Sequence, residues 1–302
     1  MKQRPYTEVD VFTSQPYFGN PLAVVRDGTG LEDEAMQRFA RWTNLSETTF
    51  LLPPTEQGAQ AGADYRVRIF TPGGELPFAG HPTLGSCYVW LTAGGTPRRA
   101  GTIVQECAKG LVRIRQEGIQ LAFAAPALER SAIDGNLLTL ITQALGVDAN
   151  HVMASQLLDN GPVWYGLLLD STDSVLGLTP DHQALTNLGV KVGVIGVDRA
   201  QTATHLIARA NRESRAFGER PCTVEVRAFA AAIGVPEDPV TGSLNASLAQ
   251  WLMEEGTLPT RYTATQGTCL GRHGQVTLNR DAEGQVWVGG EVAPCITGTV
   301  TL

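Results

Sequence analysis

The chain has 302 residues, 43% of them hydrophobic, which is enough to bury the core of one large domain or two smaller ones. Its formal net charge is −7, from 30 acidic residues against 23 lysines and arginines, and its longest basic run is a pair of arginines, Arg98 and Arg99. This pattern argues against a nucleic-acid partner. No apolar stretch approaches the core of a signal peptide or a membrane span, so a cytoplasmic protein without a membrane partner is predicted.

The usual motifs for metals and cofactors are absent from the sequence. The histidines show no HExxH spacing, and the chain has no P-loop, no GxGxxG opening a helix and no GxSxG. The five cysteines lie far apart without a CxxC pair, which argues against a disulfide framework and a zinc site: Cys87, Cys107, Cys222, Cys269 and Cys295. We therefore expect chemistry carried by side chains alone, with no cofactor and no metal.

Strands outnumber helices in the predicted element order. Strand-like runs rich in β-branched and aromatic residues are bounded by Gly, Pro, Asn and Asp, and helices are indicated by apolar residues at helical spacing. In chain order the pattern predicts strand 6–12, helix 31–42, strand 65–70, a helix from about 82 to 94, helix 131–145, strands 163–169, 191–197 and 222–229, and a helix over about 242–255. Because strands and helices do not alternate regularly, the predicted class is α+β.

Two segments of the chain share one order of features. Residues 68–90 and 227–251 both begin with Arg-x-Phe, pass through a loop containing an acid, and enter a helix that reaches a tryptophan. The residues after each helix also match loosely. Two similar domains are therefore predicted, residues 1–120 and 121–302, with a C-terminal strand at about 290–302 that can return to the first domain.

Each predicted domain places a loop directly before a helix. Helix N-termini carry unpaired backbone N–H groups and the positive end of the helix dipole, which suit a carboxylate or an enolate oxygen. If the two domains are related by a pseudo-twofold axis, the helices opening at 80-GHPT-83 and 241-TGSL-244 face each other across one cleft. Thr241, Gly242 and Ser243 add small residues there, and glycine lets a substrate approach the backbone. A small anionic, carboxylate-bearing substrate is the predicted partner.

Glu47 lies in 44-NLSETTF-50, between a predicted helix and a predicted strand. One interpretation is a capping box with Asn44 as the N-cap, and another is a solvated acid. The residues that follow, 48-TTFLLPP-54, are typical of a strand that ends at prolines, which leaves no helix to cap. Glu47 then projects from the loop before the strand, beside the hydroxyl of Ser46. In a dry cleft its pKa would rise, and it would act as general base and then as general acid.

Other polar residues near the two predicted helix starts have less specific signals. His81 stands at a helix start, where the helix dipole would keep its imidazole neutral. The alternative is that His81 is an ordinary packed histidine. Asp238 is predicted to occupy the position in the second domain that mirrors His81. The alternative is that Asp238 is an ordinary cap or turn residue, and the neighbouring Glu237 is a second candidate for the site. Glu75 is either a loop acid or the residue that orients His81. Asn20 is predicted to form a turn before a strand.

The sequence resembles the PhzF-like isomerase family over nearly its whole length. Family motifs stand here as 9-VDVFTSQPYFGNPLAVV-25, 44-NLSETTF-50, 68-RIFTPGGELPFAGHPTLG-85 and 237-EDPVTGS-243. The resemblance implies the diaminopimelate-epimerase-like fold. In that fold two similar domains each wrap a β-barrel-like sheet around a central helix, and the active site lies between them.

The resemblance also implies roles for particular residues. It makes Glu47 the catalytic acid and base, with His81 and Asp238 in support and backbone donors from Gly80, Gly242 and Ser243. Epimerases of the parent fold use a cysteine pair at the two helix starts, and none of the five cysteines stands there, so a two-thiol mechanism is not expected. Where family members often have an acid before the NLSET motif, this chain has 40-ARWT-43, and the bulky Trp42 suggests a different substrate.

The predicted function is a cofactor-independent isomerase. Glu47 would take a proton from a carboxylate-bearing carbon acid and return it at another carbon, moving a double bond, while His81 and Asp238 orient the substrate and stabilise its charge. Two alternatives stay open: an amino-acid epimerase with Asp238 as the second base, and a non-catalytic small-molecule binding protein that uses the same cleft. A homodimer is compatible with any of the three.

Overall fold

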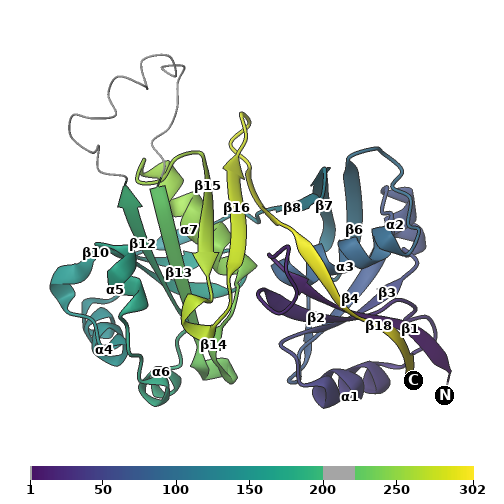
Figure 1. Cartoon of the computed structure of the whole chain (residues 1–302), viewed down its shortest axis with the longest axis horizontal. Helices are drawn as coiled ribbons and strands as arrows, with labels where there is room; N and C mark the ends of the chain where they lie inside the picture. The colour runs from purple at the N-terminus through teal and green to yellow at the C-terminus, as the bar shows by residue number, and fades with distance from the viewer. Residues whose placement is uncertain (1, 200–221) are drawn as a thin grey trace.

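The computed structural model describes residues 2–199 and 222–302 and confirms the α+β class (Figure 1). The first half contains β1 (Gln3–Val11), β2 (Asn20–Val25), α1 (Asp33–Thr43), β3 (Thr48–Leu52), α2 (Glu56–Gln60), β4 (Tyr65–Phe70), β5 (Glu75–Leu76), α3 (Gly80–Thr92), β6 (Thr102–Cys107), β7 (Gly110–Glu117) and β8 (Gln120–Ala124). The second half contains β9 (Glu129–Ser131), α4 (Gly135–Leu145), β10 (Val152–Asp159), β11 (Val163–Leu169), α5 (Thr172–Leu176), α6 (His182–Leu188), β12 (Val192–Arg199), β13 (Cys222–Ala230), β14 (Val235–Asp238), α7 (Gly242–Glu254), β15 (Arg261–Gln266), β16 (Gly274–Arg280), β17 (Val286–Gly290) and β18 (Val292–Thr301). Three short 3-10 turns complete the second half, over Ala149–His151, Ala231–Ile233 and Thr268–Leu270.

The strands of the two halves pair in the same pattern. In the first half β1–β2 is antiparallel, β2–β3 parallel, β3–β4 antiparallel, β4–β6 parallel and β6–β7 antiparallel. The second half repeats this order with β10–β11, β11–β12, β12–β13, β13–β15 and β15–β16. The repeat noticed in the sequence is therefore a repeat of supersecondary structure, while the division between residues 120 and 121 stays a prediction.

Strands also cross between the halves. β8 and β17 pair antiparallel with each other, and β18 runs back from the second half to pair antiparallel with β1 (Figure 1). β10, the counterpart of β1 in the second half, pairs instead with the short strand β9. These crossings fix the orientation of one half against the other, and so they fix the geometry of anything that lies between them.

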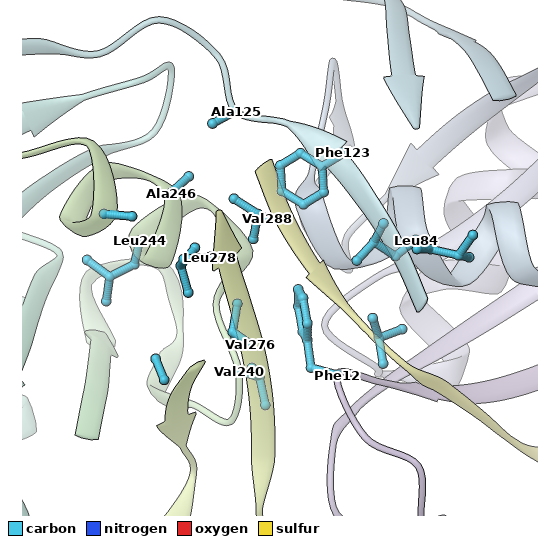
Figure 2. Packing of buried hydrophobic residues seen from close by; sticks show 14 of the residues in the cluster. Phe12, Leu84, Phe123, Ala125, Val240, Leu244, Ala246, Val276, Leu278 and Val288 are labelled. Atoms are coloured by element: carbon cyan, nitrogen blue, oxygen red, sulfur yellow. The ribbon is translucent and has the colours of Figure 1, made fainter. Parts of the chain in front are cut away.

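Helices α3 and α7 each occupy the centre of their half. Nine of the 13 residues of α3 and ten of the 13 residues of α7 are buried, so neither helix has the polar face of a surface helix. The apolar junction beside them includes Phe12, Phe123, Val240 and Val288, which lie close together in Figure 2. No helix in residues 2–199 or 222–302 combines the length and apolar character needed to cross a membrane.

The N-termini of α3 and α7 meet at this junction. A Cβ atom added to Gly242 would lie 3.3 Å from the Cα of Gly80 and 3.5 Å from the backbone nitrogen of His81. A Cβ atom added to Gly80 would lie 2.7 Å from the ring of Phe123. Since real Cβ atoms essentially never come within 3.0 Å of a neighbour, a side chain at Gly80 would force Phe123 to move, and one at Gly242 would make a tight contact with the backbone of Gly80. Glycine at these two positions therefore lets the helix starts lie close together.

The segment before β3 shows that Glu47 does not cap a helix. Helix α1 ends at Asn44, which adopts the left-handed conformation with φ 56° and ψ 24°. Its backbone N–H donates to the carbonyl of Ala40 over 3.3 Å. Asn44 is thus a C-cap, as asparagine often is, and the N-cap interpretation is wrong. Since β3 begins at Thr48, Glu47 stands on the short loop that leads into it.

Candidate active site

Glu47 and His81 face each other beside the junction where the N-termini of α3 and α7 meet. The Oε2 atom of Glu47 lies 3.3 Å from Nε2 of His81, and their side chains are 15% and 7% exposed. Although the distance suits an ion pair, the geometry does not meet that of a hydrogen bond, and both atoms are buried without a hydrogen-bond partner among the described residues. Buried polar atoms in this condition are rare in proteins, and they indicate a place where a ligand or a shared proton belongs.

Burial moves the pKa values of this pair in opposite directions. Desolvation raises the pKa of Glu47 to about 7, against the effect of a hydrogen bond from Ser46. It lowers the pKa of His81 to about 4, against the charge of Asp238 and a backbone hydrogen bond at Pro21. At neutral pH the imidazole is therefore neutral, and Glu47 is close to the middle of its titration, where a carboxyl group both accepts and donates protons efficiently.

Asp238, the last residue of β14, is the third titratable group of the site. Its Oδ1 accepts a hydrogen bond from Nδ2 of Asn20 at 3.0 Å, and its Oδ2 accepts one from Oγ1 of Thr241 at 2.6 Å. Burial raises the pKa of Asp238 to about 6, and Glu47 adds to this rise, whereas His81 and the two donors act against it. Both carboxylate oxygens thus have a partner before any ligand binds.

Asn20 connects the two halves at the site, which sequence reasoning did not anticipate. It is fully buried at the start of β2 and donates from Nδ2 to the carbonyl of Val240 at 2.8 Å as well as to Asp238. Its Oδ1 accepts from Oγ of Ser46 at 3.4 Å. One side chain therefore ties the loop that carries Glu47 to the loop that carries Asp238. Its place in 19-GNPLAVV-25, a motif of the resembling family, was the available signal.

The two helix starts complete the site with backbone donors. Neither N-cap side chain, Ala79 or Thr241, forms a capping hydrogen bond to its own helix. The first-turn N–H groups beginning at Gly80 and Gly242 therefore remain available for an anion, with two helix dipoles directed at the same place. The side chain of Ser243 is engaged on the other side, where its Oγ accepts a hydrogen bond from the indole of Trp164 at 3.2 Å.

The prediction that Asp238 mirrors His81 in the second half is wrong. Counting from the first helical residues, Gly80 and Gly242, the mirror of His81 is Ser243, and the residue mirrored by Asp238 is Leu76. Asp238 reaches the site because Asn20 and Thr241 hold it there, and symmetry with His81 plays no part.

Glu75 does not orient His81. Its carboxylate forms two hydrogen bonds of 2.7 Å with the guanidinium of Arg68. Glu237 is engaged in the same way by Arg227, with two bonds of 2.9 Å, which removes it as a competitor of Asp238. Trp42 is 79% exposed and stacks on Phe39 at the surface of α1, so it has no place in the buried site.

The residues of this site lie within a region that matches a known family. The model of the family described as "Phenazine biosynthesis-like protein" (PhzC-PhzF) matches residues 9–298. The chain belongs to this family. The match includes every residue of the site described above, and the resemblance seen in the sequence motifs is confirmed.

Curated relatives of the chain cover nearly all of it. Trans-2,3-dihydro-3-hydroxyanthranilate isomerase of Pseudomonas aeruginosa is 33% identical over 289 residues, which are 93% of this chain and 91% of that protein. A protein named antisense-enhancing sequence 1, of Schizosaccharomyces pombe, is 34% identical over 313 residues and 99% of both chains. Several relatives are thus named as isomerases, the enzyme class predicted from the sequence.

Solved structures confirm the predicted epimerase-like fold. A PhzF-family protein of Bacillus anthracis has a TM-score of 0.80 at 22% identity, with 100% of both chains covered. A probable proline racemase of Agrobacterium radiobacter K84 has a TM-score of 0.62 at 12% identity, covering 99% of this chain and 93% of that chain. The fold is thus common to the PhzF family and to a racemase, so residues at the site must decide the chemistry.

Proposed function

We propose that the protein is a cofactor-independent isomerase that moves a proton, and with it a double bond, on a small carboxylate-bearing carbon acid. The observation that carries this proposal is the buried pair of unpartnered atoms, Glu47 Oε2 and His81 Nε2, beside two converging helix N-termini. The substrate carboxylate occupies the backbone donors at Gly80 and Gly242, which places an adjacent C–H bond within reach of Glu47.

The proton transfer proceeds in two steps. Glu47 takes a proton from carbon, so the C–H bond breaks and its electron pair moves toward the substrate carboxylate as an enolate, which the two helix starts stabilise. The protonated Glu47 then returns its proton at another carbon, and the double bond ends in a new position. No other reactant is consumed, because Glu47 returns one proton for each proton that it takes. Exchange of the protonated Glu47 carboxyl with water between the two steps lets a solvent hydrogen reach carbon.

His81 stabilises Glu47 between the two steps. The backbone hydrogen bond at Pro21 requires a donor on the ring, and Nε2 is the nitrogen without a partner, so the neutral ring carries its proton on Nδ1 and presents a lone pair at Nε2. That lone pair faces Glu47 Oε2 and accepts a hydrogen bond when Glu47 is protonated. Asp238 fixes polar groups of the substrate on the opposite side.

The site favours isomerisation over epimerisation. An epimerase needs a second acid or base on the opposite face of the reacting carbon, and Asp238 is the candidate for that role. Both of its oxygens already accept hydrogen bonds, from Asn20 and Thr241, which makes it a weaker base than Glu47, whose Oε2 has no hydrogen-bond partner. Neither helix start in the described chain carries a thiol, since Cys87 lies farther along α3 and is buried.

The test is a ligand screen followed by isotope exchange. Small cyclic and acyclic carboxylates, including trans-2,3-dihydro-3-hydroxyanthranilate because a relative is named for it, are first screened for binding by thermal shift. Binders are then incubated in D₂O, and deuterium incorporation and product are followed by mass spectrometry. We expect deuterium at carbon with the wild type and none with Glu47→Gln. Binding without exchange for every ligand would support the non-catalytic binding protein instead.

A further inference from the structure

Gln266 is a buried side chain next to the site that the proposed mechanism does not use. It is the last residue of β15, it is completely inaccessible to solvent, and its amide makes four hydrogen bonds to its surroundings. Oε1 accepts from the backbone N–H of Thr241 at 3.0 Å and from Nδ2 of Asn245 at 2.8 Å. Nε2 donates to the carbonyl of Asp238 and to Oγ1 of Thr241, both at 3.0 Å.

These four bonds leave the amide one orientation. Oε1 faces two donors, and Nε2 faces a carbonyl and a hydroxyl, so a flipped amide would set its oxygen against the carbonyl of Asp238 and its nitrogen against the N–H of Thr241. Because Nε2 uses a lone pair of the Thr241 hydroxyl, the hydroxyl hydrogen is directed to Oδ2 of Asp238, where the oxygens lie 2.6 Å apart. Gln266, Thr241 and Asp238 form a directed relay of hydrogen bonds.

We propose that Gln266 is a positioning residue that holds the turn from Asp238 to Thr241 in place and keeps a donor on the Asp238 carboxylate. A catalytic consequence follows only if the proposed isomerase function is right, whereas the effect on Asp238 itself does not depend on it. Gln266 touches neither a reacting atom nor the expected place of the substrate. It acts through Thr241.

Few groups other than Thr241 influence the protonation of the Asp238 carboxylate. The facing titratable groups are Glu47 on the loop before β3, which disfavours the charged form, and His81 on α3, which favours it. Asn20 on β2 supplies the second donor, and the neighbouring Glu237 is turned toward Arg227. Thr241→Val therefore removes one of two donors from this half-buried carboxylate, and loss of Gln266 leaves the Thr241 hydroxyl free to turn away from it. In both cases the protonated form of Asp238 gains.

The first half of the chain offers a matched control. Gln105 on β6 is also fully buried and also satisfied on both ends of its amide, since Oε1 accepts from the Tyr65 hydroxyl at 2.8 Å and Nε2 donates to Oγ1 of Thr83 at 3.0 Å. It contacts neither Asp238 nor Thr241. Gln105→Met therefore reproduces the loss of a buried amide without touching the relay.

The experiment compares Gln266→Met, Thr241→Val and Gln105→Met. The side-chain carboxyl of Asp238 is titrated by carbon-13 NMR, with its signal assigned from Asp238→Asn. We expect a raised midpoint for Asp238 in Gln266→Met and in Thr241→Val and no change in Gln105→Met. In the double variant Gln266→Met/Thr241→Val the midpoint should rise no further than in Thr241→Val alone, because both changes break one relay.

Turnover gives a second readout once a substrate is known. Loss of the hydrogen bond from Gln266 to Thr241 is expected to lower kcat/KM by about tenfold in Gln266→Met. The acid limb of the pH profile of kcat/KM should move to higher pH. A folded Gln266→Met whose Asp238 titrates as in the wild type would overturn the proposal. If Gln266→Met does not fold, an unchanged midpoint in Thr241→Val overturns it instead. Failure of the isomerase function alone would leave the titration result standing.

Discussion

The two halves of the molecule share a scaffold and differ in their chemistry. Each half anchors the strand before its central helix with an arginine that stacks on a phenylalanine and binds a glutamate: Arg68 on Phe70 with Glu75, and Arg227 on Phe229 with Glu237. The ring distance is 5.0 Å in both cases. Each helix then starts at a glycine, five residues beyond the glutamate in both halves.

The positions that carry chemistry are not repeated. Thr48 pairs with Phe70 and Val192 pairs with Phe229, so Glu47 in the first half corresponds to Lys191 in the second. Lys191 lies over the indole of Trp164, with its nitrogen 5.0 Å from the ring centroid, and that indole is bonded to Ser243, the mirror of His81. The scaffold thus repeats the two glycine-led helix starts, whereas the acid beside the first of them, Glu47, is replaced by a lysine beside the second.

The largest effect is expected from replacing Glu47, and the matched change replaces its counterpart in the second half, Lys191. Glu47→Gln is expected to lower the rate of proton exchange by about 10²–10⁴, the usual contribution of a general acid and base, because the amide keeps the shape but accepts no proton. Lys191→Met serves as the matched change and should alter the rate by less than about threefold, since exposed or half-buried lysine contacts contribute little to such a site. Similar losses in both variants would mean that both halves act on the substrate.

The two arginine–glutamate pairs should differ in their contribution to stability. The Arg227 and Glu237 side chains are 5% and 7% exposed, so Glu237→Gln leaves a buried charge and should lower the free energy of unfolding by about 3–5 kcal/mol. Arg68 and Glu75 are 18% and 35% exposed, and Arg68 keeps Asp33 as a partner, so Glu75→Gln should cost at most about 1 kcal/mol. Urea unfolding measures both, and equal costs would contradict the difference in burial.

Glu47 should reduce the stability of the fold above its unfolded pKa. Its pKa rises from 4.5 to about 7 on folding, so between these values the folded state binds more protons at this residue, and stability falls as the pH rises. Glu47→Gln removes that cost and is expected to raise the free energy of unfolding at pH 8 by about 1–3 kcal/mol. The gain should vanish below pH 4.5. Unfolding curves at pH 4 and pH 8 that show the same increment would argue against a buried acid.

The smallest expected effect concerns the thiols. Burial raises the pKa of Cys87 to about 12 and also raises the pKa of Cys107, and neither residue stands at a helix start. Alkylating the accessible cysteines, or replacing Cys87 by Ser, should therefore leave proton exchange unchanged. Loss of exchange with the fold intact, judged by circular dichroism, would restore the two-thiol mechanism of the parent fold.

The sequence predicted what depends on local pattern. The central helices, their glycine starts and the strand after Glu47 follow from periodicity and turn residues. That Glu47 and His81 belong to one site was implied by the family motifs, and in the structure they lie 3.3 Å apart. Asn20 and Gln266 were not predictable in this way, because their partners lie 218 and 28 residues away and are set by strand pairing. The same holds for Glu75, whose partner Arg68 is determined by the short hairpin of β4 and β5.

The proposed function depends on Glu47 being a buried acid that titrates near neutral pH opposite a neutral His81. It is tested most directly by titrating the Glu47 carboxyl with carbon-13 NMR in the ligand-free protein, assigning its signal by its loss in Glu47→Gln. We expect a midpoint near 7, because desolvation outweighs the hydrogen bond from Ser46. A midpoint near 4.5, the ordinary value for a glutamate, would show a solvated carboxylate and would contradict a role for Glu47 as a buried acid and base.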